Sequence, residues 1–237
     1  MVFDPAAAEE NKGRKGPAAR PRDAATLILT RRAGSTVELL MGQRHASHRF
    51  MPNQYVFPGG RVDRADSSVR VGTTLREDVA GRLTKGCSPT RAQALALAAI
   101  RETFEETGLI VGHPLAPGEK APRTASSSWA EFFNTGHLPA LDKLDYVARA
   151  ITPPYRPIRF HARFFLADAA LARGEIKGSG ELLKLHWVPL GDAKKLDLPR
   201  ITAVVIDEID KLVSGKPDPQ GVPFFYFKHG KPAQAWD

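Results

Sequence analysis

The stretch Arg101-Glu-Thr-Phe-Glu-Glu-Thr-Gly-Leu-Ile110 decides how this chain is interpreted. It closes a longer segment that starts with Ser88 and a proline in the next position, a pair that caps a helix and fills its first turn. Gly108 interrupts the apolar pattern and is a typical helix stop. The sequence therefore predicts a helix over about 89–107, with the decisive residues in its last two turns.

Three carboxylates share one face of that predicted helix. At about 100° per residue, Glu102, Glu105 and Glu106 fan over about 100°, away from the apolar stripe. Carboxylates this close together near a helix C-terminus repel one another unless a cation arrives, and Mg²⁺ or Mn²⁺ is a cation that takes oxygen ligands. A plainer interpretation stays open, namely a solvated helix face on which Arg101 forms an i,i+4 ion pair with Glu105.

The rest of the chain alternates between strand and helix patterns. Two strands at 26–30 and 37–41 form a predicted hairpin, and a third strand, Gln54-Tyr-Val-Phe57, runs into Pro58-Gly-Gly60, where the glycines end it sharply. The pattern indicates one α/β or α+β domain with a mixed sheet and no internal repeat. Further predicted elements are strands at 146–151, 158–166 and 184–188, helices at about 74–84, 129–133 and 199–214, and a final strand or docked aromatic tail at 223–228.

Composition and charge narrow the function classes. The 237 residues are 42% hydrophobic and 25% charged, and no apolar run approaches the ~18 residues of a membrane span, which excludes a membrane-spanning or fully disordered protein. Residues 1–24 carry little to bury and are expected to form a flexible tail, with a single domain over 25–237. A single cysteine, Cys87, and no signal-peptide pattern favour the cytoplasm.

The net charge of +8 belongs mainly to the predicted domain. Residues 1–24 hold five bases and four acids, so +7 remains for residues 25–237. The natural partners of a basic protein are polyanions: nucleic acid, an anionic membrane or a phosphorylated small molecule. Composition alone does not choose among them.

With its glycine loop upstream, the acidic helix resembles the signature of the Nudix hydrolases, G-x5-E-x7-R-E-U-x-E-E-x-G-U, where U is aliphatic. Three departures stand out: Asp66 replaces a Glu, Thr103 replaces an aliphatic residue, and the spacer 67–100 holds 34 residues, 27 more than the usual seven. The resemblance implies an α/β/α sandwich with a mixed sheet between helices and an insert at about 67–100. The matching positions are Gly60, Arg101, Glu102, Glu105, Glu106, Gly108 and Leu109.

A second resemblance lies just ahead of this signature. The segment from Leu40 to Asp63 is similar to the L-L-T-x-R-S-x3-R-x3-G-x3-F-P-G-G-x-x-D pattern of Nudix enzymes that cleave coenzyme A, in the branch that carries an insert and acts on CoA and acyl-CoA esters. Arg44 and Arg49 fall in register, whereas His45 and Asn53 replace Ser and Gly. A guanidinium binds phosphate through two parallel hydrogen bonds, although both arginines also fit plain strand-edge charge. With Arg61, they are the candidate substrate-binding residues.

The later half adds one more family-like feature. The segment Glu181-Leu-Leu-Lys-Leu-His-Trp-Val-Pro-Leu190 looks like a Nudix strand preceded by a loop whose acid binds metal or acts as the base. Glu181 is the expected acid and Glu175 the second choice, and a surface loop residue is the alternative. Three later arginines could hold phosphates or be strand-edge charges, and His161 is expected to be structural. These arginines are Arg156, Arg159 and Arg163.

The resemblance implies a metal-dependent hydrolysis of a diphosphate bond, with Mg²⁺ or Mn²⁺ as cofactor. The expected substrate is CoA or acyl-CoA, which would give 3′,5′-ADP and 4′-phosphopantetheine or its acylated form. Either Glu181 or Glu102 would take the proton from the attacking water, and Arg101 would orient the carboxylates. The implied metal ligands are Gly60 (carbonyl), Glu102, Glu105, Glu106 and Glu181, and the implied catalytic residues are Arg101, Glu102, Glu105 and Glu181.

Two rival interpretations remain. One is a Nudix pyrophosphatase for ADP-ribose, nucleotide sugars or nucleoside triphosphates. The other is a Nudix-fold regulator that binds a nucleotide or RNA without catalysis, although a pure binder has no need for three mutually repelling acids and no nucleic-acid motif is recognisable. We therefore expect a small-molecule diphosphate as partner, with neither nucleic acid nor membrane, while a homodimer and the role of the insert stay open.

Overall fold

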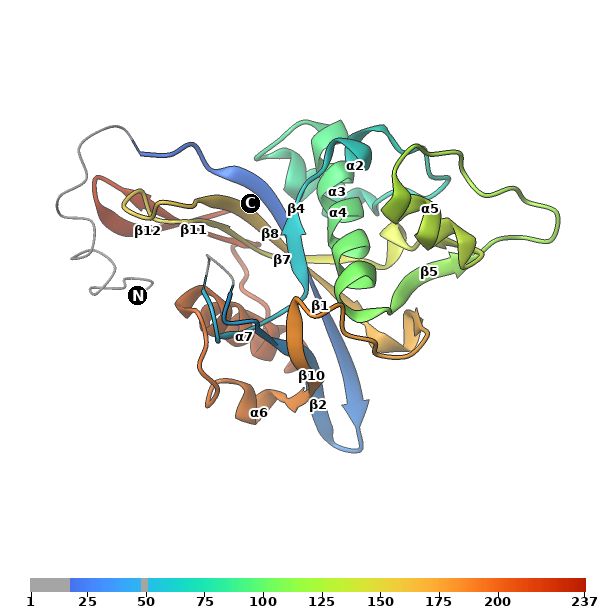
Figure 1. Cartoon of the computed structure of the whole chain (residues 1–237). Helices are drawn as coiled ribbons and strands as arrows, with labels where there is room; N and C mark the ends of the chain where they lie inside the picture. The colour runs from blue at the N-terminus through green and yellow to red at the C-terminus, as the bar shows by residue number, and fades with distance from the viewer. Residues whose placement is uncertain (1–17, 48–50) are drawn as a thin grey trace.

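The computed structural model describes residues 18–47 and 51–237. Its described residues contain a nine-stranded mixed sheet and a separate three-stranded sheet (Figure 1). The strands of the large sheet are β1 (Arg22–Ala33), β2 (Thr36–Arg44), β3 (Tyr55–Val56), β4 (Gly59–Arg61), β7 (Asp145–Ile151), β8 (Phe160–Asp168), β10 (Leu182–Pro189), β11 (Pro223–Lys228) and β12 (Lys231–Trp236). The small sheet consists of β5 (Ile110–Pro114), β6 (His137–Pro139) and β9 (Ala172–Arg173).

The large sheet mixes parallel and antiparallel pairs. Its main order is β10-β2-β1-β8-β7-β11-β12, with β3 paired to β2 and β4 paired to β1. The pairs β1/β8 and β7/β11 are parallel and the other pairs antiparallel. The helices are α2 (Arg64–Ser68), α3 (Glu77–Thr84), α4 (Pro89–Thr107), α5 (Ser127–Asn134), α6 (Leu190–Ala193) and α7 (Arg200–Val213), with short 3₁₀ turns η1 (Leu141–Lys143) and η2 (Ala169–Leu171).

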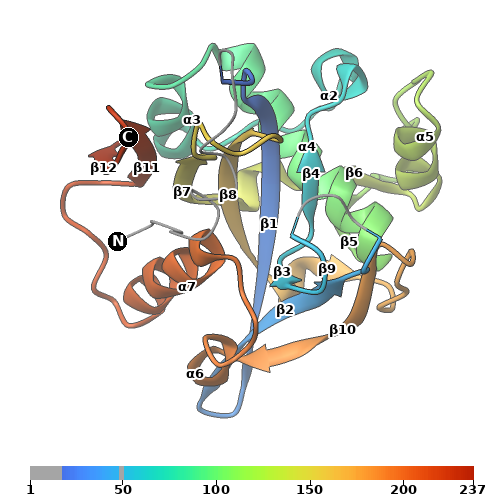
Figure 2. The same ribbon diagram turned by 60° about the vertical axis from the view of Figure 1, so that its left-hand side comes forward.

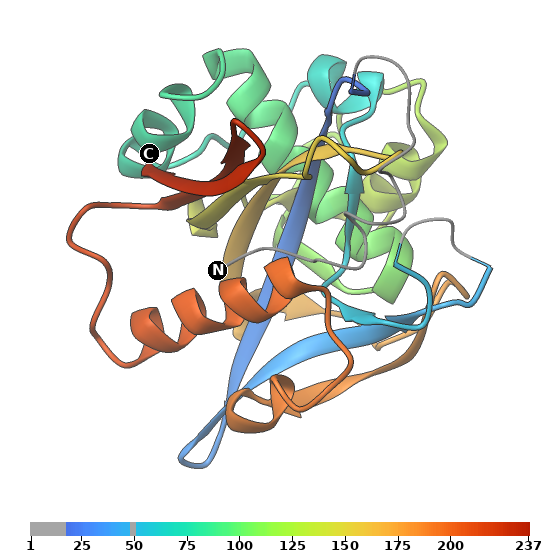
Figure 3. The same ribbon diagram turned by 90° about the vertical axis from the view of Figure 1, so that its left-hand side faces the viewer.

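Strand β1 contributes to two hydrophobic cores because successive side chains of a strand point to opposite faces. Ala25, Leu27 and Leu29 pack in the core that contains the buried face of α4, while Ile28 packs in the core beneath α7. Figures 2 and 3 show α7 crossing one face of the sheet, with α4 on the other side. The predicted α/β/α sandwich with a mixed sheet between helices is therefore confirmed.

The predicted strands and helices are found, and several of them extend further than expected. The helix expected over 199–214 is α7, and the C-terminal segment at 223–228 is strand β11. The prediction that the tail runs to residue 24 is wrong at its end, because β1 begins at Arg22. Asp23 explains this boundary: its carboxylate is within 2.7 Å of both Arg91 and Arg163, so this end of the strand is tied down. Residues 1–17 lie outside the described residues.

The insert packs against the rest of the domain through α3, which contacts α4 and β7. Within 67–100, the structure contains the end of α2, a loop, α3 and the first turns of α4. Arg76 holds the loop in place, donating to the carbonyl of Leu144 at 3.2 Å and pairing with Asp145 at 2.5 Å. Val79 and Leu83 of α3 are buried in the same core as α4. None of residues 67–88, all of which the structure describes, lines the cleft.

Among the described residues, the helices are all too short or too polar to cross a membrane.

Candidate active site

Helix α4 has the boundaries that its end residues predict. The hydroxyl of Ser88 accepts a hydrogen bond from the N–H of Arg91 at 3.3 Å, and Pro89 occupies the first turn. At the other end, Gly108 adopts a left-handed conformation with φ of 75° and its N–H donates to the carbonyl of Phe104 at 2.8 Å. The acidic residues therefore lie in the last two turns, where the helix enters the centre of the molecule.

Arg101 organises the acidic end of α4. Its Nε and Nη2 donate to the two carboxylate oxygens of Asp66 at 2.9 and 3.0 Å. Its Nη1 lies 2.9 Å from Glu102 and 2.8 Å from Glu105. Its Nη2 also donates to the carbonyl of Arg61, at the end of β4, at 3.0 Å. One guanidinium thus joins α2, α4 and β4.

Glu102 and Gly60 approach each other without room for a side chain between them. A Cβ atom placed on Gly60 would meet the carboxylate of Glu102 closer than Cβ atoms come to other atoms in proteins. Gly60 stands opposite Ala25 in antiparallel register, so β1 fixes its position. A glycine is therefore required here for the carboxylate to lie against the backbone of β4.

Glu106 is a buried carboxylate, with an exposed fraction of 5%. Its Oε2 accepts a hydrogen bond from the N–H of Gly59 at 3.0 Å. The pKa of Glu106 is raised to about 8, chiefly by burial and also by the neighbouring charge of Glu102, while the N–H of Gly59 acts in the opposite direction. Burial also raises the pKa of Glu102 to about 7, although Arg101 acts in the opposite direction. For both carboxylates the effect of burial on the pKa therefore outweighs the effect of the neighbouring positive charge.

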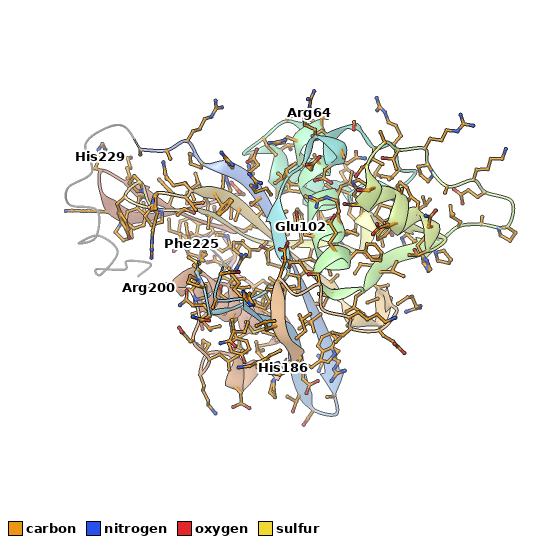
Figure 4. The ribbon with its side chains drawn as sticks, in the orientation of Figure 1. Arg64, Glu102, His186, Arg200, Phe225 and His229 are labelled. Carbon is orange, nitrogen blue, oxygen red and sulfur yellow. The ribbon has the colours of Figure 1, made fainter. Side chains whose placement is uncertain are left out.

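These carboxylates line a large cleft of about 1680 Å³. The cleft extends from β4 and α4 to the β7–β8 connection, the N-terminus of α7 and β11. Figure 4 shows Glu102 near the centre of the molecule, with Phe225 and Arg200 towards the α7 and β11 side. Aromatic and aliphatic side chains form the wall there, among them Phe225, Phe227, Tyr155 and Ile201. The cleft thus combines buried acids, arginines and an apolar wall.

Comparisons with known proteins identify this arrangement. No protein-family model matches the chain. The Caenorhabditis elegans protein named "Putative nudix hydrolase 7" is 30% identical over 154 residues, which cover 61% of this chain and 43% of that protein. The acyl-coenzyme A diphosphatase NUDT19 of Gallus gallus is 35% identical over 136 residues, covering 44% of this chain and 35% of that protein. The chain spans less than half the length of these curated relatives.

A solved structure matches over most of both chains. The crystal structure of a NUDIX hydrolase from Alicyclobacillus acidocaldarius has a TM-score of 0.61 and 27% sequence identity, and it covers 79% of this chain and 90% of that chain. This chain has the fold of the Nudix hydrolases and is similar to them in sequence. The predicted Nudix box is therefore the segment that places Gly60 against Glu102 and surrounds Arg101 with acids.

Nudix hydrolases generally act with divalent metal ions, and the donors of this Nudix site suit such an ion. Glu102, Glu106 and the Gly60 carbonyl offer oxygen ligands, which Mg²⁺ and Mn²⁺ prefer, and burial raises the pKa of both carboxylates, so that a bound cation would favour their charged form. Among the described residues, however, no three His, Cys, Asp or Glu side chains form a finished metal cluster. The fit to a divalent ion therefore rests on two carboxylates and a carbonyl.

Glu105 differs from the prediction that all three acids of the Nudix box act together. It does not line the cleft, and Arg101 holds its carboxylate at 2.8 Å. This is the i,i+4 ion pair of the plainer interpretation, so each interpretation describes part of the helix face. Of the five ligands expected from the sequence, Glu105 is the one that does not line the cleft, whereas Gly60, Glu102, Glu106 and Glu181 do.

The loop of Gly174–Gly180 places Glu181 at the cleft. The N–H of Lys177 donates to the carbonyl of Thr107 at 2.7 Å, and the N–H of Ser179 to the carbonyl of Glu106 at 3.4 Å, so the loop closes the C-terminal end of α4. Glu181 lines the cleft, and its charge contributes to raising the pKa of Glu106. Glu175 does not line the cleft, which favours Glu181 over that second choice.

The candidate arginines of the Nudix site divide into three groups. Arg44 and Arg61 line the cleft, as does Arg156. Arg49 lies outside the described residues. Arg159 also lines the cleft, but its guanidinium donates to the carbonyls of Thr152 and Ala19, at 3.0 and 2.7 Å.

The structure contradicts the expectation that Arg163 helps to bind phosphate. Its side chain is buried, pairs with Asp23 at 2.7 Å and donates to the carbonyls of Gly86 and His161. His161 belongs to the same buried network, where its Nε2 accepts a hydrogen bond from Arg149 at 2.7 Å. Neither Arg163 nor His161 lines the cleft.

Sequence reasoning missed two groups of residues. Trp129 of α5 donates its indole N–H to Asp66 at 2.9 Å, and only the apolar content of 129–133 was recognisable in the sequence. The apolar wall of the cleft comes from strands and loops that are far apart in the chain. The aromatic run at 223–228 was the available signal for Phe225 and Phe227.

Proposed function

We propose that this protein hydrolyses the diphosphate bond of CoA or acyl-CoA in a metal-dependent reaction, giving 3′,5′-ADP and 4′-phosphopantetheine or its acylated form. The observation that carries the proposal is the joining of three features in one cleft: the carboxylates Glu102 and Glu106, the arginines Arg44 and Arg61, and the apolar wall. The 35% identity to an acyl-coenzyme A diphosphatase supports this choice of substrate.

In this proposal the residues of the cleft have separate roles in hydrolysis. Glu102, Glu106 and the Gly60 carbonyl would hold the divalent cation, which neutralises charge on the diphosphate and lowers the pKa of a bound water. Glu181 accepts the proton from the attacking water, and Glu102 is the alternative base. The water oxygen bonds to one phosphorus, and the bond from that phosphorus to the bridging oxygen breaks.

Arginines and the apolar wall select the substrate in this proposal. Arg44 and Arg61 bind phosphate oxygens, since a guanidinium donates two parallel hydrogen bonds to such a group. The wall around Phe225, Phe227 and Ile201 takes the pantetheine arm and any acyl chain, because these parts of the substrate gain most from leaving water.

A panel of diphosphates separates this proposal from its rivals. Purified protein is incubated with Mg²⁺ and free CoA, acetyl-CoA, a long-chain acyl-CoA, ADP-ribose or a nucleoside triphosphate, and the products are identified by mass spectrometry. The expected product from the CoA compounds is 3′,5′-ADP. A preference for ADP-ribose of more than tenfold in kcat/KM would instead identify a pyrophosphatase of another substrate class. Binding of nucleotides without turnover of any compound would indicate a regulator.

A further inference from the structure

Asp66 is the buried anchor beneath the site. Its side chain is fully enclosed, and each carboxylate oxygen accepts two hydrogen bonds. Oδ2 accepts from the N–H of Asp63 at 2.8 Å and from Nη2 of Arg101 at 3.0 Å. Oδ1 accepts from Nε of Arg101 and from the indole N–H of Trp129, both at 2.9 Å. A buried carboxylate keeps its charge and its place through such contacts, so each donor matters.

Trp129 is the donor that comes from outside the Nudix box. It lies on α5, which packs beside α4 and α2 in Figure 1, 63 positions along the chain from Asp66. Its side chain has no exposed surface, stacks on Phe133 and meets Phe132 edge to face. The aromatic neighbours fix the ring, so the direction of its N–H is fixed as well.

The contacts form one path from α5 to the cleft. Trp129 orients Asp66, Asp66 holds two nitrogens of Arg101, and Arg101 binds Glu102 and Glu105. A carboxylate with one donor fewer can rotate, and Arg101 would follow it. Because Glu102 lies against the backbone of Gly60, a small displacement of Arg101 changes where the carboxylate sits.

We propose that Trp129 is a positioning residue for the metal-binding carboxylates, acting through Asp66 and Arg101. The inference rests on the proposed metal-dependent hydrolysis. It assigns α5 a role in the site even though none of its residues lines the cleft. The chain has an aspartate where the box pattern has the longer glutamate, and Trp129 supplies the second hydrogen bond to Oδ1 of this shorter side chain.

The variant Trp129→Phe tests this proposal. Phenylalanine keeps an aromatic ring in the cluster but lacks the N–H. The matched control is Leu83→Ala, which weakens the same hydrophobic core from α3 and lies outside the path from Trp129 to Glu102. We expect Trp129→Phe to lower kcat about tenfold and to raise the half-saturating Mg²⁺ concentration several-fold, with KM for the diphosphate unchanged, as for other residues that support metal ligands. Leu83→Ala should lower the melting temperature and keep wild-type kcat and Mg²⁺ dependence.

A measurement without substrate separates this inference from the proposed function. Binding of Mn²⁺ is followed by the electron paramagnetic resonance signal of the free ion. We expect Trp129→Phe to lower the affinity for Mn²⁺ about tenfold. Asp66→Asn alters the same hydrogen bond without altering the aromatic cluster. Because Trp129 acts through Asp66, the double variant Trp129→Phe/Asp66→Asn should bind Mn²⁺ no more weakly than Asp66→Asn alone. Wild-type kcat and Mn²⁺ affinity in Trp129→Phe would overturn the inference. A wild-type protein that binds Mn²⁺ but cleaves no diphosphate would overturn only the proposed function.

Discussion

Burial sets the chemistry of individual residues at this site. Glu106 accepts one backbone hydrogen bond and is otherwise enclosed, which explains why its pKa lies near 8. Glu105, one residue earlier, is partly exposed and pairs with Arg101. Neighbouring residues of identical type therefore have different roles, because one faces the cleft and the other faces a guanidinium.

The substitution Glu106→Gln should separate catalysis from stability. The amide keeps an oxygen for the N–H of Gly59 but offers a weaker metal ligand, so we expect turnover to fall by about 10³-fold. The melting temperature of the metal-free protein at pH 8.5 should stay the same or rise, because a buried charge is removed. Steady-state kinetics and calorimetry check both parts. Glu105→Gln is the control and should retain more activity, and an active Glu106→Gln protein would contradict the proposed site.

Local sequence predicts residues such as Gly108 better than residues such as Trp129. The roles of Ser88 and Gly108 follow from neighbours within a few positions, so the sequence is sufficient to predict both ends of α4. The contact of Trp129 with Asp66 joins residues 63 positions apart, and no periodicity in the sequence reports it. The same reason explains why the acidic residues of the helix were recognised while the pairing of Glu105 with Arg101 was left as an alternative.

At the scale of elements, strand β12 could not be predicted from the sequence because the turn before it has an unusual composition. Strand β12 was missed although His229 and Gly230 both have positive φ, the pattern of a tight two-residue hairpin turn. An Asn-Gly pair would have been recognised at once, whereas histidine is an uncommon residue in that turn. Strands β6 and β9 are three and two residues long, too short to show an alternating pattern.

The cap of α4 gives a test at this scale. Gly108 has φ of 75°, and a Cβ there would lie 3.1 Å from the carbonyl oxygen of Glu175. We expect Gly108→Ala to lower the free energy of unfolding by about 1–2 kcal/mol, through the left-handed conformation and the close contact. Gly81→Ala is the matched control in the interior of α3, where a Cβ meets nothing within 4 Å, and it should raise the stability by about 0.5–1 kcal/mol. Urea unfolding compares the two, and equal effects would contradict this account of the cap.

At the scale of the whole molecule, a buried polar network ties the sheet together. His161 lies among Arg149, Arg163 and Asp23, on strands β7, β8 and β1. The pKa of His161 is lowered to about 3, chiefly by burial and also by the charges of Arg163 and Arg149, while Asp23 acts in the opposite direction. The folded protein therefore keeps this histidine neutral, while the unfolded chain protonates it below its ordinary pKa of about 6.5.

This difference makes the stability of the whole protein depend on pH. A folded-state pKa below the unfolded value means that stability is present above about pH 6.5 and is lost as the pH falls towards 3. Between pH 7.5 and 5.5, His161 should account for a loss of about 1.4 kcal/mol in the free energy of unfolding. His161→Gln keeps an acceptor for Arg149 but does not titrate, so its stability should fall less over this range. Urea unfolding of both proteins at the two pH values measures this difference. Equal losses of unfolding free energy in the wild type and in His161→Gln would contradict the role given to His161.

The amide protons of the loop that closes α4 can report on whether the cleft is occupied. Glu106 presents its side chain to the cleft and its carbonyl to Ser179, while Lys177 binds the carbonyl of Thr107. Two amide protons of the loop therefore exchange with solvent only when the loop lifts from the helix end. Any ligand that steadies Glu106 and Glu181 together slows that exchange, so isotope labelling of Lys177 and Ser179 reports occupancy of the cleft without a substrate being turned over.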